Sequence, residues 1–350
     1  MHSITTDYLN KLVFTADQMK TLRLLGEYRG KQELFFRQSP ETLKSLLLLA
    51  KIESSESSNR LEGIEVPHKK IEELVLHDNA PKNRSEQEIA GYRDVLNLIH
   101  ESAKDIPLSV NVILQLHNTM HRYMTNPGGR FKATDNEIIE KHPDGTQRVR
   151  FSPVKAHLTP IMMDDLVKEY NIAIEHHTHD PLILIPLVIL DFLCIHPFSD
   201  GNGRLSRLLT LLLLYQFDYQ VGRYISIERI FEESKEGYYE TLETCSKNCH
   251  DAKHDVNPWL NYFWGVLVRA YREFEERVGT ITTSRGSKTE FIRNAVNRKI
   301  TSFSIADIES DCPGITRDMI RRVLRQMRDE GILIASSAGR GALWKKQERK

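Results

Sequence analysis

Cysteine, net charge and long apolar runs are all scarce in this chain of 350 residues. Its four cysteines show no framework spacing, which argues against a disulfide-stapled secreted fold and favours reduced thiols. The polar start from Met1 to Asp7 has no signal-peptide core, and no segment predicts a membrane span. We therefore expect a cytoplasmic protein with no membrane partner, long enough for more than one domain.

The segment with the highest density of chemically useful side chains runs from His196 to Arg207. It contains a histidine, an aspartate, two close glycines and two arginines. An apolar run from Pro186 to Ile195 precedes it and a leucine-rich run from Leu208 to Leu214 follows it. Both runs predict buried helices. The segment is therefore expected to form a loop and a first helical turn between two core helices.

The backbone and the arginines of this segment suit the binding of phosphate. Gly201, Asn202 and Gly203 lie ahead of the predicted helix, where backbone N–H groups can approach an anion closely. Arg204 and Arg207 are three residues apart, so they share one helix face and could grip successive phosphates. The spacing predicts an anion-binding site.

Two further side chains supply groups that a transfer reaction needs. Asp200 offers hard oxygen ligands for Mg²⁺, and His196 titrates near neutrality and could accept a proton from a hydroxyl. An ordinary helix start, with solvated arginines and a satisfied histidine, explains any one of these residues but not their density. We interpret the segment as catalytic.

The same segment resembles the signature of Fic-domain proteins, His-x-Phe-x-(Asp/Glu)-Gly-Asn-Gly-Arg-x-x-Arg, at every defined position. The resemblance implies transfer of AMP from ATP to a Ser, Thr or Tyr hydroxyl of a target protein. It implies that His196 is the general base, that Asp200 holds Mg²⁺ on the α- and β-phosphates and that Gly201–Gly203 form the anion hole. Arg204 would hold the inner phosphates and Arg207 the γ-phosphate.

A second motif matches the inhibitory pattern of the same family, (Ser/Thr)-x-x-x-Glu-(Gly/Asn), at Ser58, Glu62 and Gly63. Read alone, it is the end of a helix, because apolar residues recur at helical spacing from Leu43 and Gly63 suits the position after a helix. A carboxylate at a helix C-terminus favours a cationic partner. The resemblance implies that Glu62 pairs with Arg207 and inhibits the protein.

A β-hairpin is predicted over residues 136–153, where Asp144 and Gly145 lie between extended β-forming segments. A plain surface hairpin is the alternative interpretation. In Fic proteins a hairpin flap covers the active site and pairs with the main chain of the target. The resemblance therefore implies that residues 136–153 bind the target protein by strand addition.

Tyr238 and Tyr239 resemble the family's residues beside the adenine pocket. Some relatives have an asparagine seven residues after the second tyrosine, where this chain has Ser246. Transfer of UMP or GMP therefore stays open beside transfer of AMP. The two tyrosines could equally be half-buried aromatics of a helix.

Charge is unevenly distributed along the chain. The segment from Ile281 to Lys350 has fifteen Lys and Arg against eight Asp and Glu, whereas the whole chain has no net charge. The C-terminal segment is therefore positive and the rest of the chain is negative. This change in the sign of the charge indicates a separate C-terminal domain, and the small polar residues 280–287 predict the linker.

The C-terminal segment predicts a winged helix, whose third helix carries an apolar stripe. The expected elements are helices over 288–299 and 304–310, a third helix from the N-cap Thr316 to Gly331, a strand over 332–335, a wing tip at 338–341 and a return at Leu343 and Trp344. Arginines on the solvent side of the third helix could bind DNA through the 284–350 segment: Arg317, Arg321, Arg325 and Arg328. The alternative is a winged helix that contacts protein or dimerises.

These observations predict a mainly α protein with a Fic core, a small hairpin flap and a C-terminal winged helix. The expected domains are a regulatory region (1–84), the Fic core (85–280) and the winged helix (281–350). The predicted function is a self-inhibited protein adenylyltransferase that uses ATP and Mg²⁺ and modifies a target and itself. Removal of AMP, transfer of another nucleotide, or a DNA-binding regulator that senses a nucleotide are the alternatives. A homodimer is a family expectation.

Overall fold

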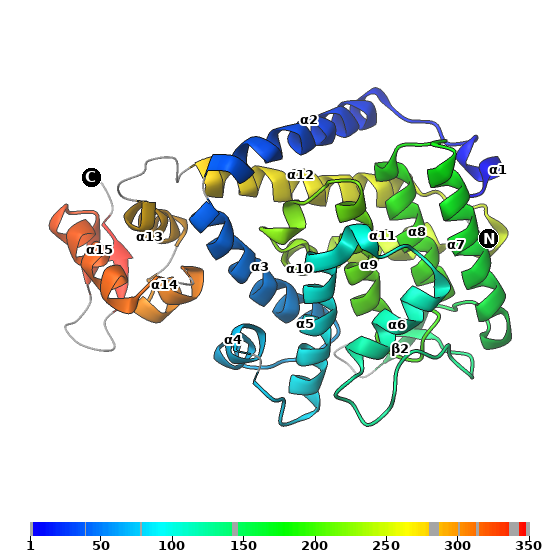
Figure 1. Ribbon diagram of the computed structural model, residues 1–350, viewed down its shortest axis with the longest axis horizontal. Helices are drawn as coiled ribbons and strands as arrows, with labels where there is room; N and C mark the ends of the chain where they lie inside the picture. The colour runs from blue at the N-terminus through cyan, green and yellow to red at the C-terminus, as the bar shows by residue number, and fades with distance from the viewer. Residues whose placement is uncertain are drawn as a thin grey trace.

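The structure is a computed structural model that describes residues 3–38, 40–77, 79–141, 146–279, 287–299, 302–312, 315–335 and 343–347. Helices make up most of it, and its strands pair as two-stranded antiparallel sheets (Figure 1). The expected mainly α fold is confirmed. Over these residues, every helix is too short or too polar to cross a membrane.

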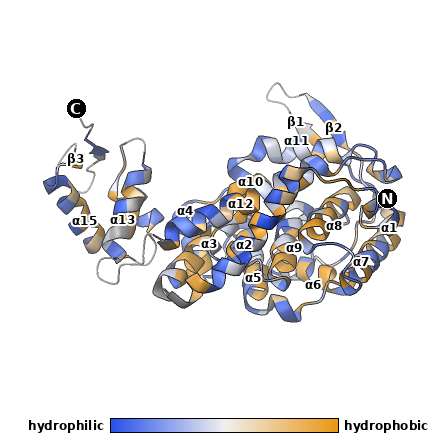
Figure 2. Ribbon diagram, turned by 90° about the horizontal axis from the view of Figure 1, so that it is seen from above, coloured by the Kyte–Doolittle hydropathy of each residue, from blue (hydrophilic) through white to orange (hydrophobic). Residues whose placement is uncertain are grey.

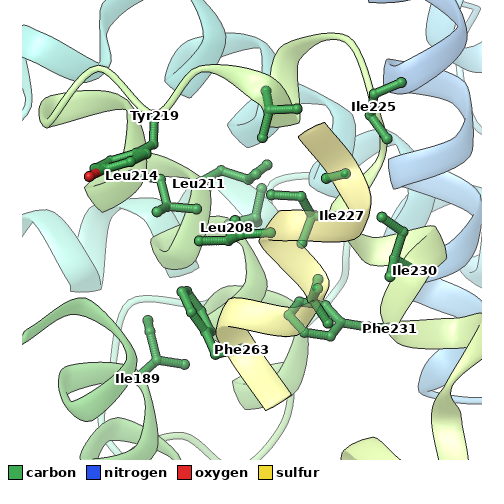
Figure 3. Packing of buried hydrophobic residues seen from close by; sticks show 14 of the residues in the cluster. Ile189, Leu208, Leu211, Leu214, Tyr219, Ile225, Ile227, Ile230, Phe231 and Phe263 are labelled. Carbon is green, nitrogen blue, oxygen red and sulfur yellow. The ribbon is translucent and has the colours of Figure 1, made fainter. Parts of the chain in front are cut away.

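Two buried helices form the centre of the molecule, α8 (Pro181–Ile195) and α9 (Asn202–Gln216). The side chain of Asp180 caps α8 by accepting the Leu182 N–H at 2.8 Å. Helix α8 is apolar along most of its length, as Figure 2 shows, and a helix that is apolar on all sides must be buried. Helix α9 has polar residues in its first turns and a buried run of leucines after them. Figure 3 shows leucines of α9 packed against neighbouring aromatic and branched side chains. The predicted pair of core helices is confirmed.

Pro186 lies inside α8, where it cannot donate a hydrogen bond to the Leu182 carbonyl one turn earlier. The indole N–H of Trp264 donates to that carbonyl at 2.8 Å instead. The indole of Trp259 donates to the Pro186 carbonyl at 2.7 Å. Trp264 therefore satisfies the carbonyl that the proline would otherwise leave unpaired, and Trp259 adds a second buried hydrogen bond at the same point of the helix.

Further helices surround this pair, most of them in the middle of Figure 1. They are α5 (Arg84–Ser102), α6 (Val110–Met120), α7 (Thr159–Glu175), α10 (Ile227–Glu233), α11 (Lys235–Ser246) and α12 (Asn257–Gly279), with the 3₁₀ turns η1 (Ala103–Asp105), η2 (Ala156–Leu158), η3 (Val221–Arg223) and η4 (Cys249–Asp251). Polar side chains at several starts, such as Asn83 before α5 and Ser109 before α6, accept a backbone N–H of the first turn.

The N-terminal helices cover one side of the core. They are α1 (Thr6–Leu9), α2 (Ala16–Gln38), α3 (Pro40–Leu61) and α4 (His68–Leu76). Helix α2 runs along α12, and α3 packs on α5 and α10 (Figure 1). The end of α3 matches the prediction, because Gly63 has a φ of +78° and the Ile64 N–H bonds to the Asn59 carbonyl at 3.0 Å.

The predicted hairpin is present as strands β1 (Ile138–Lys141) and β2 (Gln147–Phe151), which pair antiparallel with a register shift after Ile138. The expected turn residues Asp144 and Gly145 lie outside the described residues. The hairpin stands next to α11 (Figure 2).

The C-terminal segment contains three helices followed by two strands among its described residues. They are α13 (Ser287–Arg298), α14 (Ile305–Asp311), α15 (Arg317–Asp329), β3 (Leu333–Ala335) and β4 (Trp344–Lys346). The predicted stripe of α15 is buried, at Ile320, Val323, Leu324 and Met327. Thr316 holds the N-cap position without a side-chain cap bond, whereas Ser304 forms a capping box with Asp307 at the start of α14.

This C-terminal unit lies at one end of the molecule (Figure 1). It touches the N-terminal helices where the Ser310 hydroxyl and His68 Nε2 are 2.9 Å apart. Most of the expected linker, over 280–286, and the wing tip at 338–341 lie outside the described residues.

Candidate active site

The motif loop between α8 and α9 has a left-handed residue at each end, with a φ of +50° at His196 and +82° at Gly201. A side chain at Gly201 would be strained by that φ and would approach Met120 Cε to 2.7 Å. Asn202 closes the loop, because its Oδ1 accepts the Phe198 N–H at 2.9 Å and its Nδ2 donates to the Phe198 carbonyl at 2.7 Å. The Asn202 side chain thus shapes the loop, while the backbone at the start of α9 remains the candidate anion site.

His117 packs against this loop, and the sequence interpretation missed it. Its ring stacks on Phe198 with centroids 3.7 Å apart. Its Nδ1 accepts the Gly129 N–H at 2.9 Å, so its Nε2 carries the proton and donates to the Asp200 carbonyl at 3.1 Å. Burial, with a smaller effect of His121, lowers the pKa of His117 to about 4. The neutral ring of His117 therefore contacts the loop at both Phe198 and Asp200.

Lys132 was also missed, and it ties the base of the flap to the motif. Its ammonium donates to the Ile195 carbonyl at 3.1 Å and to Asn136 Oδ1 at 2.8 Å. The Asn136 amide donates to the Phe198 carbonyl at 3.2 Å. A lysine after Gly128-Gly129-Arg130 gives no periodic signal in the sequence, since its contact with the motif is a backbone carbonyl distant along the chain.

His196 has the geometry of a base. Its Nδ1 lies 3.4 Å from the Leu193 carbonyl, which favours a proton on Nδ1 and leaves Nε2 as an acceptor. The residue lines a cavity of about 400 Å³. Burial lowers the pKa of His196 to about 4, so the ring is neutral at pH 7. A neutral imidazole can accept a proton from a hydroxyl in the cavity.

Arg207 is only 2% exposed and is held by the predicted inhibitory motif. Its Nε donates to Ser58 Oγ and its Nη2 to the Ser58 carbonyl, each at 2.8 Å. The same Nη2 lies 2.7 Å from Glu62 Oε1. Burial alone would lower the pKa of Arg207, but Glu62 raises it, so the guanidinium stays charged. The predicted contact of Glu62 with Arg207 is present.

Glu62 also lies against the start of α9. A side-chain carbon built on Gly203 would come within 2.2 Å of Glu62 Oε1, so the absence of a side chain at Gly203 makes room for the carboxylate. The N-terminus of a helix attracts negative charge. Glu62 therefore lies between this helix start and Arg207, where the family resemblance predicts a phosphate.

The predicted role of Arg204 at the inner phosphates stays a prediction, and its Nη2 lies 3.6 Å from Asp200 Oδ1. Arg204 is 1% exposed, and its Nη1 donates to Glu88 Oε2 of α5 at 2.7 Å. The described residues that line the cavity do not include Arg204. A buried guanidinium needs a carboxylate partner, and Glu88 supplies it from a helix that motif spacing cannot reveal.

The walls of the cavity come from the flap and from α11. The flap supplies Ile138, Ile139, Arg150 and Phe151, and α11 supplies Tyr238, Tyr239, Leu242, Glu243 and Ser246. The Tyr239 hydroxyl donates to the Leu61 carbonyl at 3.0 Å, next to Glu62. The predicted base-binding tyrosines and the predicted phosphate site thus face one space.

Asp200 lies at the rim of this cavity, with its side chain 54% exposed. Its Oδ1 accepts the Gly201 N–H at 2.6 Å, and its other oxygen lies 3.9 Å from Arg84. Mg²⁺ takes one or two carboxylates with water and phosphate oxygens as its other ligands. A single accessible carboxylate beside an anion site fits that ion.

The arginines proposed to bind DNA lie on α15 in the C-terminal unit. Arg317 pairs with Glu309 at 3.2 Å, Arg321 with Asp318 at 3.2 Å and Arg328 with Asp329. Exposed pairs of this kind are weak and leave the cations available to a stronger anion. DNA binding by this helix stays a prediction.

Comparison with known proteins finds a family match over the central part of the chain. Residues 107–214 match the Fic/DOC family. The match includes the flap and the whole motif from His196 to Arg207 and excludes Glu62 and α11.

Three solved Fic structures share the fold. A Fic domain containing signaling protein from Bacteroides thetaiotaomicron VPI-5482 is 24% identical, with a TM-score of 0.62, over 73% of this chain and 96% of that one. A Fic family protein from Desulfovibrio desulfuricans G20 is 18% identical, with a TM-score of 0.62, over 97% and 98%. Residues 134–508 of Fic-1 from C. elegans are 18% identical, with a TM-score of 0.59, over 77% and 74%. These likenesses establish a Fic-type fold.

Proposed function

We propose that this chain is a self-inhibited protein adenylyltransferase, which transfers AMP from ATP to a hydroxyl of a target protein and of itself. One observation carries the proposal. A carboxylate, Glu62, lies where a helix start and Arg207 both attract an anion, in a cavity that also contains a neutral His196. Phosphate oxygens would take this position when Glu62 leaves it.

The cavity residues account for the chemistry of the step. The target hydroxyl would lose its proton to His196 Nε2 as its oxygen forms a bond to the α-phosphorus of ATP. The bond from that phosphorus to the bridging oxygen would break, and pyrophosphate would leave. The N-terminus of α9 and Arg207 would stabilise the phosphate charge. Asp200 would hold Mg²⁺, which supplies further charge neutralisation when bound.

The remaining proposed roles belong to residues that line the cavity. The flap of residues 136–153 would align an extended target segment by strand addition, since its described residues form a small two-stranded antiparallel sheet. Tyr239 and Ser246 would face the base of the nucleotide. Transfer of another nucleotide is tested by comparing the four nucleoside triphosphates.

The test distinguishes adenylyl from phosphoryl transfer. Glu62→Gly protein is incubated with ATP labelled at either the α- or the γ-phosphate. We expect protein-bound label from the α-position only, and none from either position in Glu62→Gly/His196→Ala. Label from the γ-position would replace this proposal with a kinase, and no label from any nucleoside triphosphate would refute it.

A further inference from the structure

A single carboxylate on α11 holds two arginines of the flap. Arg148 and Arg150 are alternate residues of β2, so they project from the same face of the strand. Arg148 Nη2 and Arg150 Nε each donate to Glu243 Oε2 at 3.0 Å. Glu243 and Arg150 are each 20% exposed, whereas Arg148 is 52% exposed, so solvent screens the Arg148 contact more than the Arg150 contact.

The same face of α11 also carries Tyr239, which lines the cavity and contacts the inhibitory segment. The guanidinium carbon of Arg150 lies 5.3 Å from the centroid of the Tyr239 ring, within the range of a cation–π interaction. The hydroxyl of Tyr239 bonds to the Leu61 carbonyl. The ring and the carboxylate, four residues apart on α11, therefore hold Arg150 from two sides.

The flap depends on such contacts because it is small. It is a two-stranded sheet of four and five residues, and an isolated hairpin of this size is marginally stable. Its opposite face exposes Ile139 and Val149, which are paired across the strands and 46% and 49% exposed. At the end of β2, Phe151 also contacts the body of the molecule, because its ring stacks on His250 with centroids 5.5 Å apart. Arg148 and Arg150 hold the middle of β2, next to the exposed Val149.

We propose that Glu243 is a positioning residue, which acts through Arg148 and Arg150 to fix the flap over the cavity and so to present the acceptor hydroxyl to His196. The expected effect on turnover rests on the proposed transfer reaction. The contact of Glu243 with Arg148 and Arg150, which forms the clamp on the flap, is independent of that reaction. Displacing a reacting group by about 1 Å can cost on the order of 10²-fold in rate, so a loosened flap must affect turnover.

The experiment uses the full chain in the Glu62→Gly background, with ATP as the substrate and self-modification as the readout. Glu243→Gln keeps the shape of the side chain but removes its charge. We expect a fall in kcat of about tenfold to a hundredfold with the KM for ATP within about threefold. Hydrogen exchange at residues 147–151, measured without nucleotide, should become faster by about threefold to tenfold.

Three further variants sharpen the result. Glu243→Asp, which keeps the charge, should retain more activity than Glu243→Gln. Arg148→Gln should also make exchange at residues 147–151 faster. The double variant Glu243→Gln/Arg148→Gln should exchange no faster than the faster of the two single variants, because both changes break one cluster. Glu240→Gln, an exposed acid on the same helix, is the matched control and should change neither readout.

Two outcomes would overturn the assignment. Unchanged exchange at residues 147–151 in Glu243→Gln would show that the carboxylate does not hold the flap. A raised KM for ATP with unchanged exchange would make Glu243 a nucleotide contact instead. If the Glu62→Gly protein transfers no nucleotide at all, the proposed function fails, while the exchange experiment still tests the clamp.

Discussion

Replacing Glu62 by glycine tests how strongly the inhibitory segment acts. The Glu62–Arg207 contact is 2.7 Å long, with Arg207 2% and Glu62 33% exposed. A hydrogen bond to a charged group contributes about 1.5–3 kcal/mol, and partial exposure of Glu62 favours the lower end. Since about 1.4 kcal/mol corresponds to a factor of ten, loss of this competition should strengthen ATP binding by about tenfold.

The larger effect is expected on turnover. On the proposed function, Glu62 would keep the terminal phosphate of ATP from Arg207, and the α-phosphate would be displaced from His196. A displacement of about 1 Å accounts for on the order of 10²-fold in rate, so Glu62→Gly should raise kcat by about that factor. Label from α-labelled ATP, incorporated into the chain itself at saturating ATP, gives the measurement.

The controls separate release of inhibition from general damage. Arg207→Ala should not activate, because Arg207 is also needed for the phosphates, and Glu62→Gly/Arg207→Ala should resemble Arg207→Ala. Glu65→Gly, at an exposed acid three residues later, should behave as wild type. Equal transfer by wild type and Glu62→Gly would refute the reasoning and leave Glu62 as a residue of the helix end.

Three other expectations follow from the geometry. Asp200→Asn should weaken Mg²⁺-dependent ATP binding in titration calorimetry while leaving metal-free binding unchanged; equal loss in both would contradict a metal role. Because burial lowers the pKa of His196 to about 4 and the neutral ring is the active form, the rate should stay level as pH falls and be lost only near pH 4. A loss near pH 6.5 would mean a solvated histidine. Trp264→Phe should lower the free energy of unfolding by about 1–3 kcal/mol in urea denaturation, because the Leu182 carbonyl beside Pro186 loses its donor; no change would mean that another group satisfies it.

The sequence predicted those parts of the site that depend on short-range spacing. The loop between two core helices, the helix end at Gly63 and the hairpin strands all follow from periodicity and turn residues, and the structure has them. The contact of Glu62 with Arg207 came from a family pattern, because helix-end preferences alone do not choose a partner across 145 residues.

Contacts between distant segments escaped sequence reasoning. The role of Arg204 at the phosphates stays a prediction, but its buried partner Glu88 on α5 was not foreseen. His117 and Lys132 support the motif loop through backbone groups, which leave no mark on residue spacing. The clamp at Glu243 joins a strand to a helix more than ninety residues away. Each depends on how helices pack, which a single sequence does not specify.

The central claim is that His196 and the anion site at the start of α9 transfer a nucleotide to protein. Intact-protein mass spectrometry of Glu62→Gly after incubation with ATP and Mg²⁺ tests it most directly, beside Glu62→Gly/His196→Ala. The account predicts added mass of one AMP unit per modified hydroxyl in the first protein and none in the second, although both bind ATP with similar affinity. Equal modification of the two proteins, or added phosphate in place of AMP, would contradict it.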